Sequence, residues 1–352
     1  MRYSQLKIDQ DSSILAGLKL MDSIDRKLLL VFSGDSFKGL VSIGDIQRAI
    51  IKNYHLDTSI KMVMRENIKT ATEEYSDEQI KSLMLEYRME CLPILNSEGK
   101  LSRVVMWEDI FEVGNAFPIQ KFDLPVVIMA GGKGTRLKPL TNVIPKPLIP
   151  IGEKTFMEDI MDRFVSCGSS NFYVSVNYKA DVIRRYFDNL EKAPYSIQYY
   201  QENEPLGTAG SLTLMKDHIH STFFVTNCDI LIKEDYSQIL KYHKENKNEL
   251  TVVAALKNYP ISYGVLHTRE NGLLDTIVEK PDLTFKINTG LYILEANLLD
   301  EIPEGQFYHI TYLIEKLRKE NRRVGVFPVS EKSWVDVGSW SEYLSIVNKQ
   351  IF

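Results

Sequence analysis

From residue 124 onwards, short apolar segments alternate with amphipathic ones, and this alternation constrains the fold more than any other feature of the chain. The apolar segments have the length and composition of strands: PVVIMA, NFYVSV, TFFVTN, LTVVAA, GLYIL and VGVFPV. Stretches with a helical spacing of apolar residues lie between them, such as MEDIMDRFVSCG and DVIRRYFDNLEK. Such alternation predicts an α/β layer structure with a mostly parallel sheet.

Residues 1–118 follow a different pattern, a weak internal repeat. The segment GLVSIGDIQRA aligns with SRVVMWEDIFE, and an amphipathic helical stretch followed by an apolar strand precedes each of them. Each copy, residues 1–58 and 59–118, is therefore predicted to read helix, strand, strand, helix. The resulting module belongs to the α+β class.

The length of the chain fits two domains. At 352 residues it exceeds the size at which a single core stops growing, about 250 to 300 residues. The stretch VGNAFPIQKFDLP mixes Gly, Asn, Pro and polar residues between the two patterns. We place the linker at residues 119–123 and the second domain at residues 124–352.

Charge and cysteine content exclude several functional classes. The net charge of -5 is mild, which argues against a nucleic-acid partner. Cys91, Cys167 and Cys228 lack the paired spacing of a zinc site or a disulfide framework, which indicates a reducing compartment. There is neither an apolar leader at the N-terminus nor a run of about 18 apolar residues, so we expect a cytoplasmic protein without a membrane partner.

A glycine-rich loop follows the first strand of the second domain. The strand VVIMA runs into GGKGTRLKPLT and then PKPLIPIG, at the end of a strand where open α/β sheets bind ligands. Gly131, Gly132 and Gly134 would let backbone N–H groups approach phosphate oxygens closely. Leu137 stands where the dinucleotide fingerprint needs glycine, and the Walker pattern does not fit either.

The segment AGGKGTRLKPLTNVIPKPLIPIG resembles the opening motif of the sugar-1-phosphate nucleotidyltransferases, also called sugar-nucleotide pyrophosphorylases. The resemblance implies a Rossmann-like, GT-A-like sheet, with Mg²⁺ as the cofactor. It also implies that Arg136 and Lys146 stabilise the negative charge of a departing pyrophosphate. The nucleotide would contact residues of the loop: Ala130, Gly131, Gly132, Gly134, Thr135 and Arg136.

Further segments extend the resemblance along the domain. YYQENEPLGTAGSL is similar to the family's base-reading segment, which implies that Gln201, Gly207 and Thr208 contact the nucleotide. ISYGVL, VEKP and INTGLYIL are similar to its sugar-side segments. They imply a sugar phosphate site in which Lys280 is the cation for the incoming phosphate: Tyr263, Gly264, Glu279, Lys280 and Asn288.

Two aspartates match the family's metal ligands. Asp229 follows an apolar strand in FFVTNCDILI, and Asp336 lies in SWVDVGSW. Mg²⁺ prefers hard oxygen ligands from one or two carboxylates together with phosphates and water. Where the family usually has Gly-Asp, this chain has Cys228-Asp229, which leaves the carboxylate intact.

The N-terminal repeat resembles a tandem CBS module, which implies an adenine or guanine nucleotide in its cleft. Ser42 stands three residues before Asp45, as in that family, whereas Met106 stands before Asp109 in the second copy. Ser42, Asp45 and Asp109 are the candidate ligand residues. The alternative is a packing or dimerisation unit without a ligand.

These resemblances predict an enzyme that transfers a nucleotidyl group from a nucleoside triphosphate to a sugar 1-phosphate, with Arg136, Lys146, Asp229 and Lys280 as catalytic residues. The PLGTAG form and the CBS-like pair resemble guanylyltransferases of bacterial surface-sugar (legionaminate-type) pathways. They favour GTP with glucosamine 1-phosphate or mannose 1-phosphate, and we expect a homo-oligomer. The alternatives are an inactive sugar-nucleotide sensor or regulatory subunit and a thymidylyl, uridylyl or cytidylyl transferase. An appended acyltransferase β-helix is not expected, because hexapeptide repeats are absent.

Overall fold

The computed structural model describes residues 3–87, 89–111, 120–190 and 193–349. The chain divides into two compact units, Met1–Ile119 and Gln120–Phe352. Residue 119 of the predicted linker lies outside the described residues, and residues 120–123 lie at the start of the second unit. No helix in the described part of the chain is long and apolar enough to cross a membrane.

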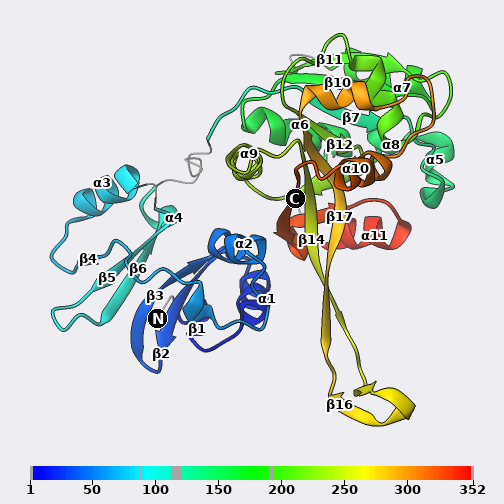
Figure 1. The fold of residues 1–352 in the computed structure, drawn as a ribbon. Helices are drawn as coiled ribbons and strands as arrows, with labels where there is room; N and C mark the ends of the chain where they lie inside the picture. The colour runs from blue at the N-terminus through cyan, green and yellow to red at the C-terminus, as the bar shows by residue number, and fades with distance from the viewer. Residues whose placement is uncertain (1–2, 88, 112–119, 191–192, 350–352) are drawn as a thin grey trace. The chain divides into compact units, whose positions relative to one another are not determined.

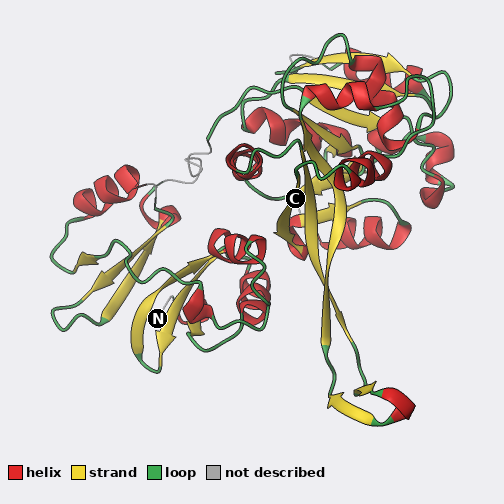
Figure 2. Ribbon diagram, viewed as in Figure 1, coloured by secondary structure: helices red, strands yellow, loops and turns green. Residues whose placement is uncertain are grey.

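The first unit is built from two similar halves (Figures 1 and 2). Each half has a three-stranded sheet, β1-β2-β3 and β4-β5-β6, flanked by helices. The predicted order of helix, strand, strand, helix is found in α1-β2-β3-α2 and in α3-β5-β6-α4, and each sheet adds a short parallel strand that the sequence pattern did not indicate. The elements are β1 (Lys7–Asp9), α1 (Ile14–Ile24), β2 (Leu28–Ser33), β3 (Ser36–Ser42), α2 (Ile43–Ile51), β4 (Ala71–Thr72), α3 (Asp77–Tyr87), β5 (Cys91–Leu95), β6 (Leu101–Met106) and α4 (Trp107–Ile110).

The second unit is organised around a seven-stranded sheet in the order β11-β10-β7-β12-β17-β14-β18. The strands from β11 to β12 are parallel, β17 is antiparallel to both of its neighbours, and β14 and β18 are again parallel. The predicted mostly parallel sheet is confirmed. The strands of this sheet are β7 (Val126–Ala130), β10 (Asn171–Val176), β11 (Ser196–Gln201), β12 (Phe223–Asn227), β14 (Leu250–Pro260), β17 (Asp282–Leu294) and β18 (Val324–Ser330).

Helices and short two-stranded pairs complete the second unit (Figure 2). The α-helices are α5 (Leu140–Val143), α6 (Phe156–Ser166), α7 (Ala180–Asp188), α8 (Gly207–Gly210), α9 (Tyr236–Glu245), α10 (Ile310–Lys319) and α11 (Trp340–Lys349). The remaining strands are β8 (Pro150–Ile151), β9 (Lys154–Thr155), β13 (Ile230–Ile232), β15 (Val265–Thr268), β16 (Leu274–Val278) and β19 (Trp334–Asp336).

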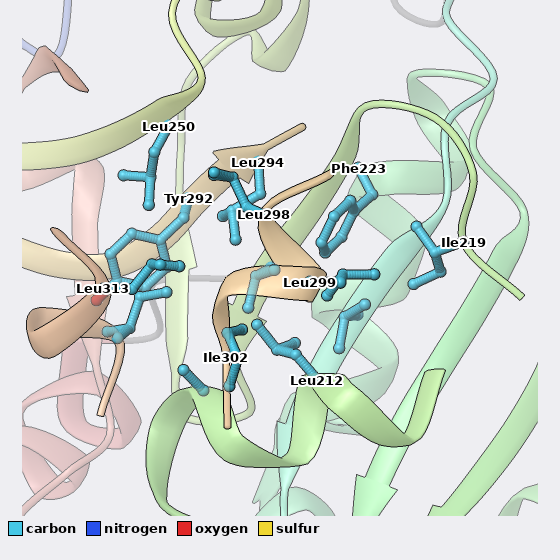
Figure 3. Packing of buried hydrophobic residues seen from close by; sticks show 14 of the residues in the cluster. Leu212, Ile219, Phe223, Leu250, Tyr292, Leu294, Leu298, Leu299, Ile302 and Leu313 are labelled. Atoms are coloured by element: carbon cyan, nitrogen blue, oxygen red, sulfur yellow. The ribbon is translucent and has the colours of Figure 1, made fainter. Parts of the chain in front are cut away.

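A large apolar cluster packs on one side of the sheet (Figure 3). Strand residues Phe223 and Leu250 meet Leu212, which follows α8, and Leu313, which lies on α10; all four are fully buried. Burial of each such side chain contributes about 1.5 to 3 kcal/mol to folding. The cluster therefore fixes the segment that begins with α8 against the ends of the central strands.

Strands β14 and β17 continue well past the sheet as a two-stranded ribbon. The pair remains in register from Leu256 opposite Lys286 to Pro260 opposite Asp282, whereas the last pair between β14 and β18 is Leu256 with Ser330. The hairpin of β15 and β16 closes the far end of the ribbon. Figure 1 shows this projection leading away from the body of the unit. We call residues 257–285 the arm.

Candidate active site

A cavity of about 370 Å³ lies at the carboxyl ends of β7 and β12. Parallel strands bring their carboxyl ends to the same edge, where open α/β sheets bind ligands. Nine of the residues singled out from the sequence line it: Gly131, Gly132, Gly134, Thr135, Arg136, Lys146, Gly207, Thr208 and Asp229. Their common location brings the glycine loop, the start of α8 and the end of β12 around one space.

The glycine loop is closely packed against its neighbours. Gly134 has a left-handed backbone with a φ of 60°, and its carbonyl accepts a hydrogen bond from Thr141 Oγ1 at 2.9 Å. A Cβ at this position would lie 2.8 Å from Thr141 Cγ2 and 3.3 Å from Lys146 Cβ. Glycine is therefore required here both by the backbone angle and by the space.

Lys146 and Asp229 form an ion pair on the cavity wall. Lys146 starts the short 3-10 helix Lys146–Leu148, and Asp229 lies in the turn between β12 and β13. Their side chains are only 11% and 15% exposed, so both charges are largely removed from water and depend on each other. Burial raises the pKa of the neighbouring Cys228 thiol to about 12, so this residue adds no charge beside Asp229.

Asp336 lies next to Asp229, although the two are far apart in the sequence. Strands β13 and β19 pair with Ile230 opposite Asp336, and the Val337 N–H donates to the Asp229 carbonyl at 2.9 Å. Burial and then the negative charge of Asp229 raise the pKa of the Asp336 carboxyl to about 6. Its Oδ1 atom is buried without a hydrogen-bond partner among the described residues.

Arg136 belongs to the same cluster through Gly338. A Cβ on Gly338 would lie 2.7 Å from Asp336 Oδ1 and 3.0 Å from Arg136 Nη2. The absence of a side chain at Gly338 thus allows the guanidinium and the carboxylate to approach the same point. The guanidinium of Arg136 and the carboxylate of Asp229 line the cavity, and Asp336 lies beside them outside the lining.

This donor set fits a hard divalent cation. Asp229 and Asp336 offer carboxylate oxygens from adjacent backbone segments, and no described residue forms a hydrogen bond with the buried Asp336 Oδ1. In the described ranges, no group of three or more His, Cys, Asp and Glu side chains could hold a metal ion. An ion held here would therefore need further oxygen ligands that these side chains do not supply, such as water or a bound ligand.

Glu202 lines the cavity and was missed by the sequence analysis, which selected the adjacent Gln201. The Glu202 carboxylate accepts hydrogen bonds from the Ser175 hydroxyl and, at 3.0 Å, from the Leu206 N–H. The Gln201 amide oxygen instead accepts from Arg184 Nη2 at 3.2 Å, outside the cavity lining. Successive residues of an extended chain point to opposite sides. The alternation along β11, which ends at Gln201, could therefore have indicated that the next residue, Glu202, points into the cavity.

Other candidate positions lie around the cavity rather than in it. Ala130 is 1% exposed at the end of β7 and supports the loop from behind. Asn288 lies on β17 within the sheet, where its side chain donates to the Tyr292 hydroxyl at 2.9 Å. Met129, Asn227 and Phe307 also line the cavity, and no motif in the sequence marked them.

The four remaining sugar-side residues lie on the arm. Tyr263 is 79% exposed, and Glu279 and Lys280 are exposed as well. A Cβ on Gly264 would lie 2.9 Å from Glu279 Oε2, so the two predicted segments meet each other across the arm. The structure therefore brings these residues together, but it does not bring them to the cavity of the same chain.

In the first unit, Ser42 and Asp45 form a capping box at the start of α2. Asp45 is 6% exposed and forms ion pairs with Arg48 and Arg65. In the second half, the Met106 N–H donates to the Asp109 carboxylate at 3.0 Å.

A cavity of about 310 Å³ in this unit is lined by residues from both halves: Asp25, Arg26, Lys27, Leu28, Glu90, Met106, Trp107 and Glu108. The three predicted ligand residues, Ser42, Asp45 and Asp109, lie outside that lining.

Comparison with known proteins gives two family matches. A family model described as nucleotidyl transferase matches residues 125–351, and a CBS domain model matches residues 60–115. A mannose-1-phosphate guanyltransferase of Schizosaccharomyces pombe is 33% identical over 230 residues, which cover 63% of this chain and 63% of that protein. The corresponding enzyme of Saccharomyces cerevisiae is 33% identical over 227 residues, 62% of each chain. This chain thus spans less than two thirds of the length of these curated relatives.

Solved structures are also similar to this chain over about the length of the second unit. The crystal structure of HddC from Yersinia pseudotuberculosis has a TM-score of 0.52 at 29% identity and covers 64% of this chain and 99% of its own. HddC has also been solved in complex with GMP-PN, with a TM-score of 0.51 at 28% identity, 64% of this chain and 99% of its own. A putative glucose-1-phosphate thymidylyltransferase from Bacillus anthracis, at 20% identity and a TM-score of 0.53, covers 64% of this chain and 94% of its own and shares the fold.

Proposed function

Because this chain belongs to the nucleotidyl transferase family, we propose that it transfers a nucleotidyl group from a nucleoside triphosphate to a sugar 1-phosphate and releases pyrophosphate. The observation that carries this proposal is the cavity at the ends of β7 and β12. Its glycine loop suits a polyphosphate, Arg136 supplies a cation, and Asp229 lies beside Asp336 at its edge. A site that only bound a sugar nucleotide would not need two adjacent carboxylates.

In the proposed reaction, a phosphate oxygen of the sugar 1-phosphate attacks the α-phosphorus of the triphosphate, and the bond from that phosphorus to pyrophosphate breaks. The nucleophile is already an anion at neutral pH, so no general base is required. The protein mainly positions two polyanions and offsets their charge. The N–H groups of the glycine loop hold the triphosphate, and Arg136 stabilises the leaving pyrophosphate. Lys146 pairs with the Asp229 carboxylate and holds it in position.

Members of this family generally use a divalent metal ion. We propose that the ion is Mg²⁺ and that Asp229 and Asp336 hold it. When bound, it would supply positive charge for phosphate oxygens and relieve the repulsion between these two carboxylates.

The proposed substrates are GTP and mannose 1-phosphate or glucosamine 1-phosphate. Support for the guanine base comes from relatives named mannose-1-phosphate guanyltransferase and from the HddC complex with GMP-PN. The thymidylyltransferase neighbour supports the fold alone, and transfer of another base remains the alternative. We also propose a cytoplasmic location, in keeping with nucleotide substrates.

The N-terminal unit is proposed to bind an adenine or guanine nucleotide and to regulate the transfer. The CBS domain match and the cavity of about 310 Å³ between the two halves support this role. Assembly without a ligand is the alternative. The test is calorimetry on full-length variants in which nucleotide binding to the cavity of the second unit is abolished. Heat released by an adenine or guanine nucleotide would then report binding to the N-terminal unit.

A screen of pyrophosphate release tests the proposed activity. The full chain is incubated with Mg²⁺, each of five nucleoside triphosphates and a panel of sugar 1-phosphates, and the products are separated by chromatography. We expect turnover with GTP and one of the two proposed sugars. Binding of a sugar nucleotide without turnover of any pair would favour the inactive sensor instead.

A further inference from the structure

The arm exposes an unusual amount of apolar surface. Nine large apolar side chains on it are between 43% and 79% exposed: Tyr259, Tyr263, Leu266, Leu273, Leu274, Ile277, Val278, Leu283 and Phe285. Scattered apolar residues are normal on a protein surface, but a contiguous patch above a few hundred Å² marks an interaction site. Three of the nine are aromatic and six are aliphatic. At on the order of 100 Å² of exposed area for each aromatic side chain and somewhat less for each aliphatic one, the nine offer roughly 700 Å². A standard interface buries about 800 Å² on each side.

The arm is also poorly supported by its own chain. A two-stranded hairpin is marginally stable in water unless further strands or another surface cover it. Beyond Leu256, β14 pairs only with β17 among the described strands, and the hairpin of β15 and β16 forms a sheet of its own. A surface that covers the arm would therefore stabilise it as well as bury its apolar side chains.

The arm could supply a cation beyond the two that line the described cavity. Within the described lining, the cationic side chains are Arg136 and Lys146, and Lys146 is already paired with Asp229. The proposed reaction brings a triphosphate and a second phosphate into this space, and their mutual repulsion needs additional positive charge. Lys280 is exposed on the arm beside Glu279, whose carboxylate could accept hydrogen bonds from sugar hydroxyls.

The ribbon does not lead back to the cavity of its own chain. Its register is unbroken from Leu256 to Pro260, and the Ile261 N–H continues the ladder to the Pro281 carbonyl at 3.0 Å. At about 3.3 Å per residue, this ribbon carries Lys280 roughly 20 Å beyond Lys286 at the edge of the sheet. Folding the arm back would break these backbone pairs.

We propose that two copies of this chain exchange their arms, so that Lys280 of one copy completes the cavity of the other. This proposal rests on the proposed function and on the role as a cation for the sugar phosphate that the VEKP resemblance implies for Lys280. A reciprocal exchange about a two-fold axis would bury both arms in one closed dimer. Each copy would then have a complete site, with the sugar phosphate side contributed by the second copy.

Complementation between two defective variants tests the exchange. Asp229→Ala removes a residue of the body and Lys280→Ala a residue of the arm, so each variant alone should lose pyrophosphate release. After mixing at equal concentration and re-equilibration, half of the dimers are mixed and have one intact site, which predicts about a quarter of wild-type activity. The matched control mixes Asp229→Ala with Arg136→Ala. Both defects lie in the body, so no activity should return.

The outcomes separate the two proposals. Wild-type chain without activity on any substrate pair would contradict the proposed function itself. An active wild type with no recovery in the Asp229→Ala and Lys280→Ala mixture, or a fully active Lys280→Ala, would overturn the exchange of Lys280. Asp229→Asn with Lys280→Gln serves as a second pair if an alanine variant does not fold.

The mass of the full chain in solution gives a readout that does not depend on activity. Analytical ultracentrifugation should find a dimer for the wild type and a weaker one for the variant Leu266→Asp with Ile277→Asp. Val182→Asp is the control, because Val182 is 45% exposed on α7, away from the arm. A monomeric wild type, or an arm variant with unchanged dimer affinity, would overturn the packing of the arm on a second copy.

Discussion

Gly338→Ala is a sharp test of the acidic and cationic cluster at the cavity edge. Gly338 is not among the residues with a positive φ, so alanine introduces no left-handed strain. Its Cβ would lie 2.7 Å from Asp336 Oδ1 and 3.0 Å from Arg136 Nη2, whereas ordinary contacts begin at 3.4 Å. Restoring ordinary contacts therefore needs displacements of about 0.7 Å at Asp336 and about 0.4 Å at Arg136.

These displacements set the expected magnitude. A misplacement of about 1 Å can cost about 100-fold in rate, so we expect kcat/KM to fall between about 10-fold and 100-fold. That loss corresponds to about 1.4 to 2.7 kcal/mol of transition-state stabilisation. The Arg136 end can move into solvent, so the free energy of unfolding should fall by less, on the order of 1 kcal/mol.

The assay combines pyrophosphate release over a range of Mg²⁺ concentrations with thermal unfolding of the same sample. The Mg²⁺ concentration for half-maximal rate should rise, because Asp336 is displaced. Gly44→Ala in α2 is a matched control, since its Cβ would meet its nearest neighbour at an ordinary 3.4 Å. Wild-type kcat/KM and wild-type Mg²⁺ dependence in Gly338→Ala would refute the placement of Arg136 and Asp336 in the reaction.

Three further perturbations have defined outcomes. Asp229→Asn should reduce pyrophosphate release by about 100- to 1000-fold, the magnitude expected when one charge-stabilising group is lost, with an unchanged circular dichroism spectrum; retained activity would remove Asp229 from the mechanism. Gly134→Ala should lower the free energy of unfolding in urea by about 1 to 2 kcal/mol or more, because of its φ of 60° and the contact with Thr141. Burial lowers the pKa of His243, so the unfolded chain binds the extra proton first and stability should decrease as the pH falls below about 6.5. His243→Gln should flatten this dependence in chemical unfolding, and an unchanged slope would contradict it.

Much of the sheet and the cavity could be predicted because both depend on local sequence. The six apolar segments selected from the sequence became β7, β10, β12, β14, β17 and β18. Since β7 and β12 are parallel neighbours, their carboxyl ends coincide, which places Asp229 beside the glycine loop. Which of Gln201 and Glu202 lines the cavity could not be predicted in this way. The resemblance identified a segment, but it did not identify the side to which each side chain points.

The location of the sugar-side residues could not be predicted from local sequence for a physical reason. ISYGVL and VEKP specify two segments that meet across a ribbon, and the contact between Gly264 and Glu279 satisfies that requirement wherever the ribbon points. The direction of the ribbon is set by the pairing of β14 with β17, which is unbroken beyond Leu256. The VEKP motif can therefore supply the expected cation and still act in the cavity of a second copy of the chain. Under the proposed exchange of arms, the apolar residues of the arm are as necessary for turnover as Lys280, because they determine which cavity Lys280 reaches.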